Sequence, residues 1–268
     1  MDERIAAYWE REDIARAILA ALTARGADLD ALTPDALAPV DQFHGGGKPV
    51  TERLARLAGA GPGQRVLDVG GGFGGSARTL AVEFGCLVTT VDLTPSYVGA
   101  ARMLTARMRL DDRVSHQVGN ALALPFPDGA FDLVWTQNSG MNIADKEGLY
   151  RGFHRVLRPG GRLALQEPMT GTVAPPVYPV MWARDESTSF LRAPAEMRAV
   201  IEAAGFRALV WDDVTAETAG PPTGAAVPPH SIQRLVMGET IDAIIRAHRR
   251  NREEGRLVSV QAVFERTC

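Results

Sequence analysis

Cysteine is scarce in this chain: the 268 residues include only Cys86 and Cys268, which lie far apart. They have neither the close spacing of a metal-binding cluster nor the number needed for a disulfide framework. The first residues are charged and lack the apolar core of a secretion signal. We therefore expect no metal site and a protein of a reducing compartment, the cytoplasm.

Long apolar runs and an excess of one charge are also missing. No stretch approaches the roughly 20 apolar residues that span a bilayer. Lysine and arginine number 29 against 32 aspartates and glutamates, which gives a formal net charge of −3. These values argue against a nucleic-acid or anionic-membrane partner, although a local basic patch stays possible. They do not define the oligomeric state, and a homodimer is left open.

Strand and helix patterns alternate from residue 65 onward, which predicts an α/β fold. Short apolar segments predict strands at 65–69, 87–92, 114–118, 131–137, 162–167, 206–214 and 259–266. Helical spacing predicts helices at 76–84, 95–108, 146–157, 194–204 and 230–252. Such alternation indicates a Rossmann-like, seven-stranded and mostly parallel sheet with helices on both faces. The last strand follows a long insertion and is expected to lie antiparallel beside 162–167.

The chain is expected to have two parts. Residues 1–50 should form an N-terminal helical lid or substrate segment, because 3–25 has the spacing of an amphipathic helix. Residues 51–268 should form the Rossmann-like domain, with 168–193 and 216–257 as insertions on the substrate side.

A glycine-rich turn follows the first expected strand. Residues 66–75 read Val-Leu-Asp-Val-Gly-Gly-Gly-Phe-Gly-Gly, and Asp92 ends the second expected strand. Glycine has no Cβ, so a bound molecule can lie against the bare backbone. A carboxylate at the end of the second strand can accept hydrogen bonds from ribose hydroxyls. Together these features indicate a cofactor that contains adenosine.

The glycine spacing alone does not identify this cofactor, because Gly70, Gly72 and Gly75 also satisfy the dinucleotide fingerprint. Asp68, inside the first strand, is more informative. A pyrophosphate at the helix N-terminus gains nothing from a nearby carboxylate, whereas an ammonium or sulfonium group does. A nicotinamide-dependent oxidoreductase is the second hypothesis, but the Ser/Tyr-x-x-x-Lys arrangement that would support it is missing from the sequence.

Three further motifs complete the pattern: the Asn120-Ala121 pair, the Phe-Asp-Leu-Val strand at 131–134, and the Arg-Val-Leu-Arg-Pro-Gly-Gly-Arg-Leu run at 155–163. With these, residues 66–167 resemble the class I S-adenosylmethionine-dependent methyltransferases. The nearest group contains the sarcosine, dimethylglycine, phosphoethanolamine and tocopherol methyltransferases. The resemblance covers roughly residues 41–212 and the last strand.

The resemblance implies an enzyme that moves a methyl group from S-adenosylmethionine to a small-molecule acceptor and leaves S-adenosylhomocysteine. An amine nitrogen is slightly favoured as the acceptor atom. The alternative is O- or C-methylation of a natural-product scaffold, and the alternative of another class is a non-catalytic S-adenosylmethionine-binding protein.

The resemblance also assigns residues to the methionine end of the cofactor. Gly70 and Gly72 would let that end lie on the backbone, and Asp68 would orient the loop or the amino group. Gln137, at the end of the fourth strand, would offer its backbone carbonyl to the ammonium. A purely structural role for Asp68 is the alternative.

At the adenosine end, the resemblance assigns the ribose hydroxyls to Asp92 and packing on adenine to Leu93. Asn120 would accept a hydrogen bond from adenine where the family usually has aspartate, and Ala121 would offer its backbone N–H. A helix cap is the alternative role for Asp92, and an Asx turn is the alternative for Asn120.

Two residues are candidate bases, since an acceptor that loses a proton benefits from one. His44 lies in a glycine-rich loop where the family folds a lid, and a loop-anchoring hydrogen bond is its alternative role. Glu167 ends the fifth strand, where it could bind a cationic acceptor or take a proton; a loop salt bridge is the alternative. His248 lies in a charged run and is expected to be structural or solvated.

Acceptor contacts are expected from three segments. Asn138 and Met141 belong to a polar turn after the fourth strand, at the edge where open α/β sheets bind ligands. Tyr178 and Trp182 lie in an aromatic crossover segment that predicts a hydrophobic pocket or lid, with core packing as the alternative. His230 begins the helix after a proline-rich loop, and helix capping or exposure is its alternative.

Overall fold

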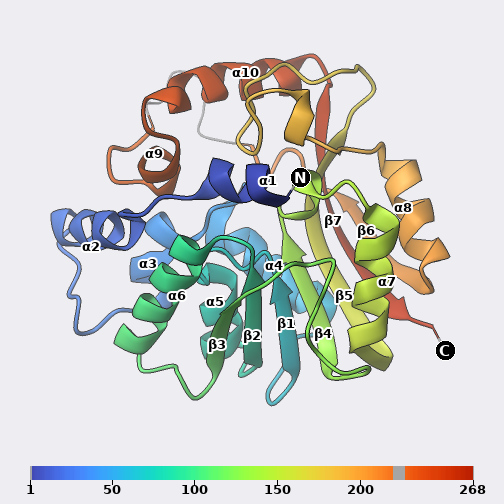
Figure 1. The fold of residues 1–268 in the computed structure, drawn as a ribbon, viewed down its shortest axis with the longest axis horizontal. Helices are drawn as coiled ribbons and strands as arrows, with labels where there is room; N and C mark the ends of the chain where they lie inside the picture. Colours follow the sequence, from blue (N-terminus) through green and yellow to red (C-terminus); the bar gives the residue numbers. More distant parts are fainter. Residues whose placement is uncertain (1, 220–226, 268) are drawn as a thin grey trace.

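The computed structural model describes residues 2–219 and 227–267. Its strands form one seven-stranded sheet in the order β3-β2-β1-β4-β5-β7-β6 (Figure 1). Only β7 runs antiparallel to its neighbours, β5 and β6. The strands are β1 Arg65–Val69, β2 Leu87–Asp92, β3 Val114–Val118, β4 Phe131–Gln137, β5 Leu157–Thr170, β6 Phe206–Asp213 and β7 Leu257–Arg266. The expected α/β fold, with its antiparallel last strand, is confirmed.

Helices cover both faces of this sheet, because alternate strand residues point to opposite sides. Val66 of β1 packs in a hydrophobic core with Leu80 of α5, while Leu67 packs in another core with Phe153 of α7. The helices are α1 Asp2–Trp9, α2 Ile14–Ala24, α3 Pro34–Asp41, α4 Gly47–Ala58, α5 Gly75–Glu83, α6 Pro95–Arg107, α7 Lys146–Val156, α8 Pro194–Ala203, α9 Ile232–Met237 and α10 Ile241–Glu253.

Two expected helices are each divided in the structure. The helix expected at 3–25 is interrupted between α1 and α2, where Arg11 donates from Nε to the carbonyl of Val236 at 2.9 Å. The helix expected at 230–252 is interrupted at Gly238, which has a φ of 55°. A tertiary contact accompanies the first break, and the conformation of a glycine accompanies the second. In both places the apolar spacing continues although the helix does not.

The fifth strand is longer than expected, since β5 begins at Leu157 instead of residue 162. Its pairing with β4 jumps from Phe131–Leu157 to Leu133–Arg162, so the intervening residues form a bulge. The Pro-Gly-Gly segment at 159–161 is therefore an irregular entry into the strand.

The N-terminal segment packs over the carboxyl ends of the strands. Ile18 of α2, Leu37 of α3, Leu104 of α6 and Ile241 share one hydrophobic core. Figure 1 shows α1 and α2 beside α9, although these helices lie at opposite ends of the sequence. The division at residue 50 stays a prediction. Residues 220–226, inside the expected 216–257 insertion, lie outside the described residues.

None of the helices within residues 2–219 and 227–267 combines the length and apolarity needed to cross a membrane.

Candidate active site

A cavity of about 980 Å³ opens at the carboxyl ends of β1, β2 and β4. This is the edge at which open α/β sheets bind ligands. The turns after these strands line one end of the cavity. Side chains from α1, the loop at 42–47, α10 and the start of β7 line the other end.

The glycine turn is shaped so that glycine is required at position 70. Gly70 has a φ of 76°, and a Cβ placed on it would lie 2.2 Å from the Cβ of Ser139. Gly72 has a φ of 51°, but a Cβ there would meet no atom within 4 Å. The turn thus presents bare backbone to the cavity, held on one side by the loop after β4.

Asp92 fixes this turn from the end of β2. Its Oδ2 accepts a hydrogen bond from the backbone N–H of Gly72 at 2.8 Å, and its Oδ1 accepts one from Thr94 at 2.9 Å. Each carboxylate oxygen has further acceptor capacity. Asp92 can therefore hold the turn and still accept hydrogen bonds from a ligand in the cavity.

Asp68 places a carboxylate against the same turn. Its side chain is 2% exposed, and Oδ2 has no hydrogen-bond partner within the described residues. Burial, with a smaller contribution from Asp92, raises the pKa of Asp68 to about 7. A buried carboxylate oxygen without a partner is costly, so a donor or cation in the cavity would stabilise this arrangement.

The turn after β3 borders the cavity next to Leu93. The Oδ1 of Asn120 accepts a hydrogen bond from the backbone N–H of Leu122 at 2.9 Å. This is the Asx turn that the sequence analysis gave as the alternative role of Asn120. Asn120 and Ala121 both belong to the cavity lining.

The side chain of Gln137 is satisfied by the protein itself. Its Oε1 accepts from Ser76 Oγ at 2.7 Å and from Trp135 Nε1 at 3.0 Å, and its Nε2 donates to Gln166 Oε1 at 3.2 Å. The side-chain oxygen is therefore occupied by the protein, and the group that the sequence analysis assigned to a ligand is the backbone carbonyl.

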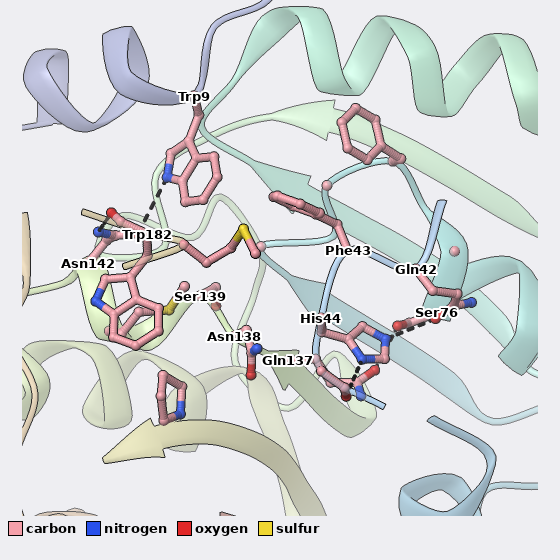
Figure 2. A pocket seen from close by; sticks show the side chains of 18 of the residues that line it. Trp9, Gln42, Phe43, His44, Ser76, Gln137, Asn138, Ser139, Asn142 and Trp182 are labelled. Carbon is pink, nitrogen blue, oxygen red and sulfur yellow. Dashed lines mark hydrogen bonds between the residues drawn. The ribbon is translucent and has the colours of Figure 1, made fainter. Parts of the chain in front are cut away.

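His44 lines the cavity, but both nitrogens of its imidazole already contact neighbouring residues of the protein. Nε2 lies 2.9 Å from Gln42 Oε1 and 3.0 Å from Thr51 Oγ1, and Nδ1 lies 3.2 Å from the carbonyl of Gly45 (Figure 2). Burial lowers the pKa of His44 to about 4. The imidazole is therefore neutral at pH 7, and these contacts favour the anchoring role.

Glu167 does not border the cavity, contrary to its expected role as a base or acceptor contact. Its Oε1 accepts from the backbone N–H groups of Ser139 at 3.2 Å and Gly140 at 2.8 Å. Burial raises its pKa. The carboxylate lies beneath the loop after β4 and supports the short 3-10 helix η1 (Gly140–Asn142), so its effect on a ligand is indirect.

Of the expected acceptor residues, Asn138, Met141 and Trp182 line the cavity, and two do not. Tyr178 packs at the edge of the hydrophobic cluster around Trp182. His230 is exposed and lies outside the lining.

Asn142 joins the segments around Trp9 and Trp182 in the cavity lining, a role that the sequence did not reveal. Its Oδ1 accepts from Trp9 Nε1 at 3.3 Å, and its Nδ2 donates to the carbonyls of Trp182 at 3.0 Å and Thr188 at 2.7 Å (Figure 2). The side chain therefore connects α1 and the aromatic crossover segment to η1.

His248 also borders the cavity, although its charged surroundings in the sequence indicated a solvated residue. Ile245, His248 and Arg252 of α10 all belong to the lining, and this near-helical spacing is the signal that could have identified the face. The ring nitrogens of His248 have no hydrogen bond within the described part of the chain. Burial, with a smaller contribution from Arg252, lowers its pKa.

The sequence profile of the Methyltransferase domain family matches residues 67–165. Methyltransferase GfsG of Streptomyces halstedii is 33% identical over 193 residues, which are 71% of this chain and 69% of that relative. Sarcosine/dimethylglycine N-methyltransferase of Halorhodospira halochloris is 32% identical over 167 residues, 61% of this chain and 59% of the relative. A probable tocopherol O-methyltransferase of rice is 44% identical over 100 residues, 37% of this chain.

The stretch that this chain shares with the rice relative covers only 28% of that relative's length.

Among solved structures, the geranyl diphosphate C-methyltransferase of Streptomyces coelicolor A3(2) superimposes with a TM-score of 0.73 at 22% identity, covering 99% of this chain and 98% of that one. At that identity the likeness concerns the fold.

Proposed function

This chain belongs to the S-adenosylmethionine-dependent methyltransferases, and on that premise we propose that it transfers the cofactor's methyl group to a small-molecule acceptor. The observation that carries the proposal is the crevice at the end of β1. There, bare backbone at Gly70 and Gly72 adjoins the unpartnered carboxylate oxygen of Asp68 and the carboxylate of Asp92.

In this proposal the methionine end of the cofactor lies on the backbone of Gly70 and Gly72. The carboxylate of Asp68 and the backbone carbonyl of Gln137 receive the ammonium. These groups fit a cation because Asp68 is buried and its Oδ2 has no hydrogen-bond partner among the described residues.

The adenosine end lies across the ends of β2 and β3. Asp92 accepts hydrogen bonds from the ribose hydroxyls, and Leu93 packs on the adenine. Asn120 accepts a hydrogen bond from the adenine amino group, and Ala121 offers its backbone N–H.

When bound, the cofactor supplies a methyl group that is already activated on a sulfonium. The residues of this chain therefore mainly align the acceptor and exclude water. Trp9, Trp182 and Met141 form the cover that excludes water at the acceptor end. A role for His44 as a base stays a prediction, since its Nε2 would first have to release Gln42 and Thr51.

The acceptor atom is not decided by similarity, because the relatives carry the names of N- and O-methyltransferases. A non-catalytic protein that only binds the cofactor is the second candidate, and the Asx-turn asparagine at position 120 is the observation that favours it. We also propose a cytoplasmic location, based on the low cysteine content, and leave a homodimer as the assembly to be tested.

Calorimetric titration tests the cofactor assignment. We expect S-adenosylhomocysteine to bind the parent protein and NADH not to bind. Asp92→Ala should weaken S-adenosylhomocysteine binding by about 1–3 kcal/mol, because the ribose loses an acceptor and the Gly72 N–H loses its partner. Binding of NADH, or unchanged affinity in Asp92→Ala, would contradict the assignment.

Transfer of labelled methyl groups into a cell extract separates an enzyme from a non-catalytic binding protein.

The affinity for S-adenosylmethionine should depend on the ionisation of Asp68. Its pKa of about 7 in the free protein means that the carboxyl is mostly protonated at pH 6. The ammonium of the cofactor favours the ionised form, so binding should weaken by roughly 5- to 10-fold as the pH falls from 7.5 to 6. Calorimetry at several pH values measures this change. Asp68→Asn should bind more weakly throughout with a flatter pH profile, and an equally steep profile in that variant would assign the effect to another group.

A further inference from the structure

The cavity is large enough to extend well beyond the glycine turn. Its volume of about 980 Å³ lies at the top of the range of about 300–1,000 Å³ that is typical of small-molecule pockets. Its lining continues from the glycine turn to residues of α1, η1 and α10, and we refer to this second part as the acceptor compartment.

Within the described residues, each carboxylate that borders the cavity belongs to the cofactor crevice or already has a partner in the protein. Four carboxylates border the whole cavity, Asp41, Asp68, Asp92 and Asp145. Asp68 and Asp92 belong to the cofactor crevice, Asp41 is paired with Arg78, and Asp145 caps α7. Residues 220–226, which the structure does not describe, read Gly-Pro-Pro-Thr-Gly-Ala-Ala and contain no charged side chain.

Arg252 lines the compartment from α10, and Arg25 also belongs to the cavity lining. The imidazole of His248 lies in the lining beside Arg252, and burial lowers its pKa, which favours the neutral ring. An ammonium placed there would be desolvated beside positive charge without a counter-ion, which is unfavourable. A neutral molecule, or one with an acidic or hydroxyl group at its end, meets no such penalty.

Two indoles present their apolar surfaces to the compartment because their N–H groups are already used. Trp9 Nε1 donates to Asn142 Oδ1 at 3.3 Å, and Trp182 Nε1 donates to Ser189 Oγ at 2.9 Å. Figure 2 shows both rings next to the cavity; Asn142 contacts the indole of Trp9 and the backbone carbonyl of Trp182. The thioethers of Met141 and Met181 complete an apolar and adaptable lining.

We infer that the acceptor is a bulky, mainly apolar molecule without a positive charge, held between Trp9 and Trp182, and not a small amine. This inference rests on the proposed function, because it assigns the glycine crevice to the cofactor and only the remaining compartment to the acceptor. It favours O- or C-methylation of an apolar scaffold.

Binding of a neutral apolar fluorophore tests the inference. N-Phenyl-1-naphthylamine is titrated into protein saturated with S-adenosylhomocysteine, and its fluorescence is expected to rise with saturation. Trp182→Ala and the milder Trp182→Phe should weaken probe binding, by about 10-fold or more for the alanine. Trp211→Phe is the matched control, since Trp211 packs on Phe264 of the sheet and lies outside the cavity lining.

Competition separates the two acceptor classes. Geraniol should displace the probe, whereas sarcosine and dimethylglycine should neither displace it nor accept labelled methyl groups. The inference is overturned if the saturated protein does not bind the probe, if the Trp182 variants bind it as the parent does, or if either amine competes or is methylated. Failure of S-adenosylhomocysteine itself to bind would instead count against the proposed function.

Discussion

Gly70→Ala should weaken S-adenosylhomocysteine binding by about 100-fold or more, roughly 2.7 kcal/mol. Residue 70 has a φ of 76°, which costs a residue with a Cβ about 1 kcal/mol or more. The added Cβ would also lie 2.2 Å from the Cβ of Ser139. Ser139 cannot easily retreat, because its Oγ lies 2.6 Å from Thr136 Oγ1 and donates to the carbonyl of Val69 at 3.1 Å. The turn must therefore open, and calorimetric titration would measure the loss.

Gly72→Ala is the matched control for this prediction. It has the same kind of strain, with a φ of 51°, but no atom lies within 4 Å of its added Cβ. Its effect should be clearly smaller. Adding Ser139→Gly to Gly70→Ala removes the clashing Cβ and should restore part of the affinity. A stronger effect at Gly72, or no rescue in the double variant, would show that the clash with Ser139 is not the cause.

Arg78→Met should lower the free energy of unfolding by about 3–5 kcal/mol, the usual cost of leaving one partner of a buried ion pair alone. Arg78 and Asp41 have side chains 0% and 1% exposed, and Arg78 Nη2 donates to Asp41 Oδ2 at 2.7 Å. The same guanidinium donates to the carbonyl of Phe73 at 2.6 Å, in the glycine turn. Urea denaturation, followed by circular dichroism, would measure the change.

Two variants separate burial from charge in this experiment. Arg198→Met breaks an exposed pair with Glu202, with side chains 48% and 42% exposed, and should change stability by less than about 1 kcal/mol. Asp41→Asn combined with Arg78→Met removes the unpaired carboxylate and should recover part of the loss. If Arg78→Met were as mild as Arg198→Met, the buried pair would not stabilise the fold.

The cofactor end of the site was predictable from short stretches of sequence. The strand that ends before Gly70, the glycine turn itself and Asp92 at the end of β2 all lie where the patterns placed them. Each signal is local: apolar alternation marks a strand, and a turn with positive φ selects glycine. The parallel order of the sheet then brings the two strand ends to one edge.

The roles of His44 and Glu167 were harder to predict, because they depend on partners that the local sequence does not identify. The Nε2 of His44 contacts Gln42 of its own loop and Thr51 of α4. Thr51 reaches the imidazole because α4 begins directly after this loop. The carboxylate of Glu167 points beneath the loop after β4, which the position of a residue at the end of a strand does not reveal.

The sequence by itself determined the α/β fold, the order of its strands along the chain and the crevice of bare backbone for the cofactor, because these depend on periodicity and glycine geometry within short segments. Only the tertiary structure decided the compartment that we propose for the acceptor. Trp9, Asn142 and Trp182 come from separate segments, and His248 comes from near the end of the chain. Their meeting depends on how distant segments pack against one another, and no local pattern encodes that.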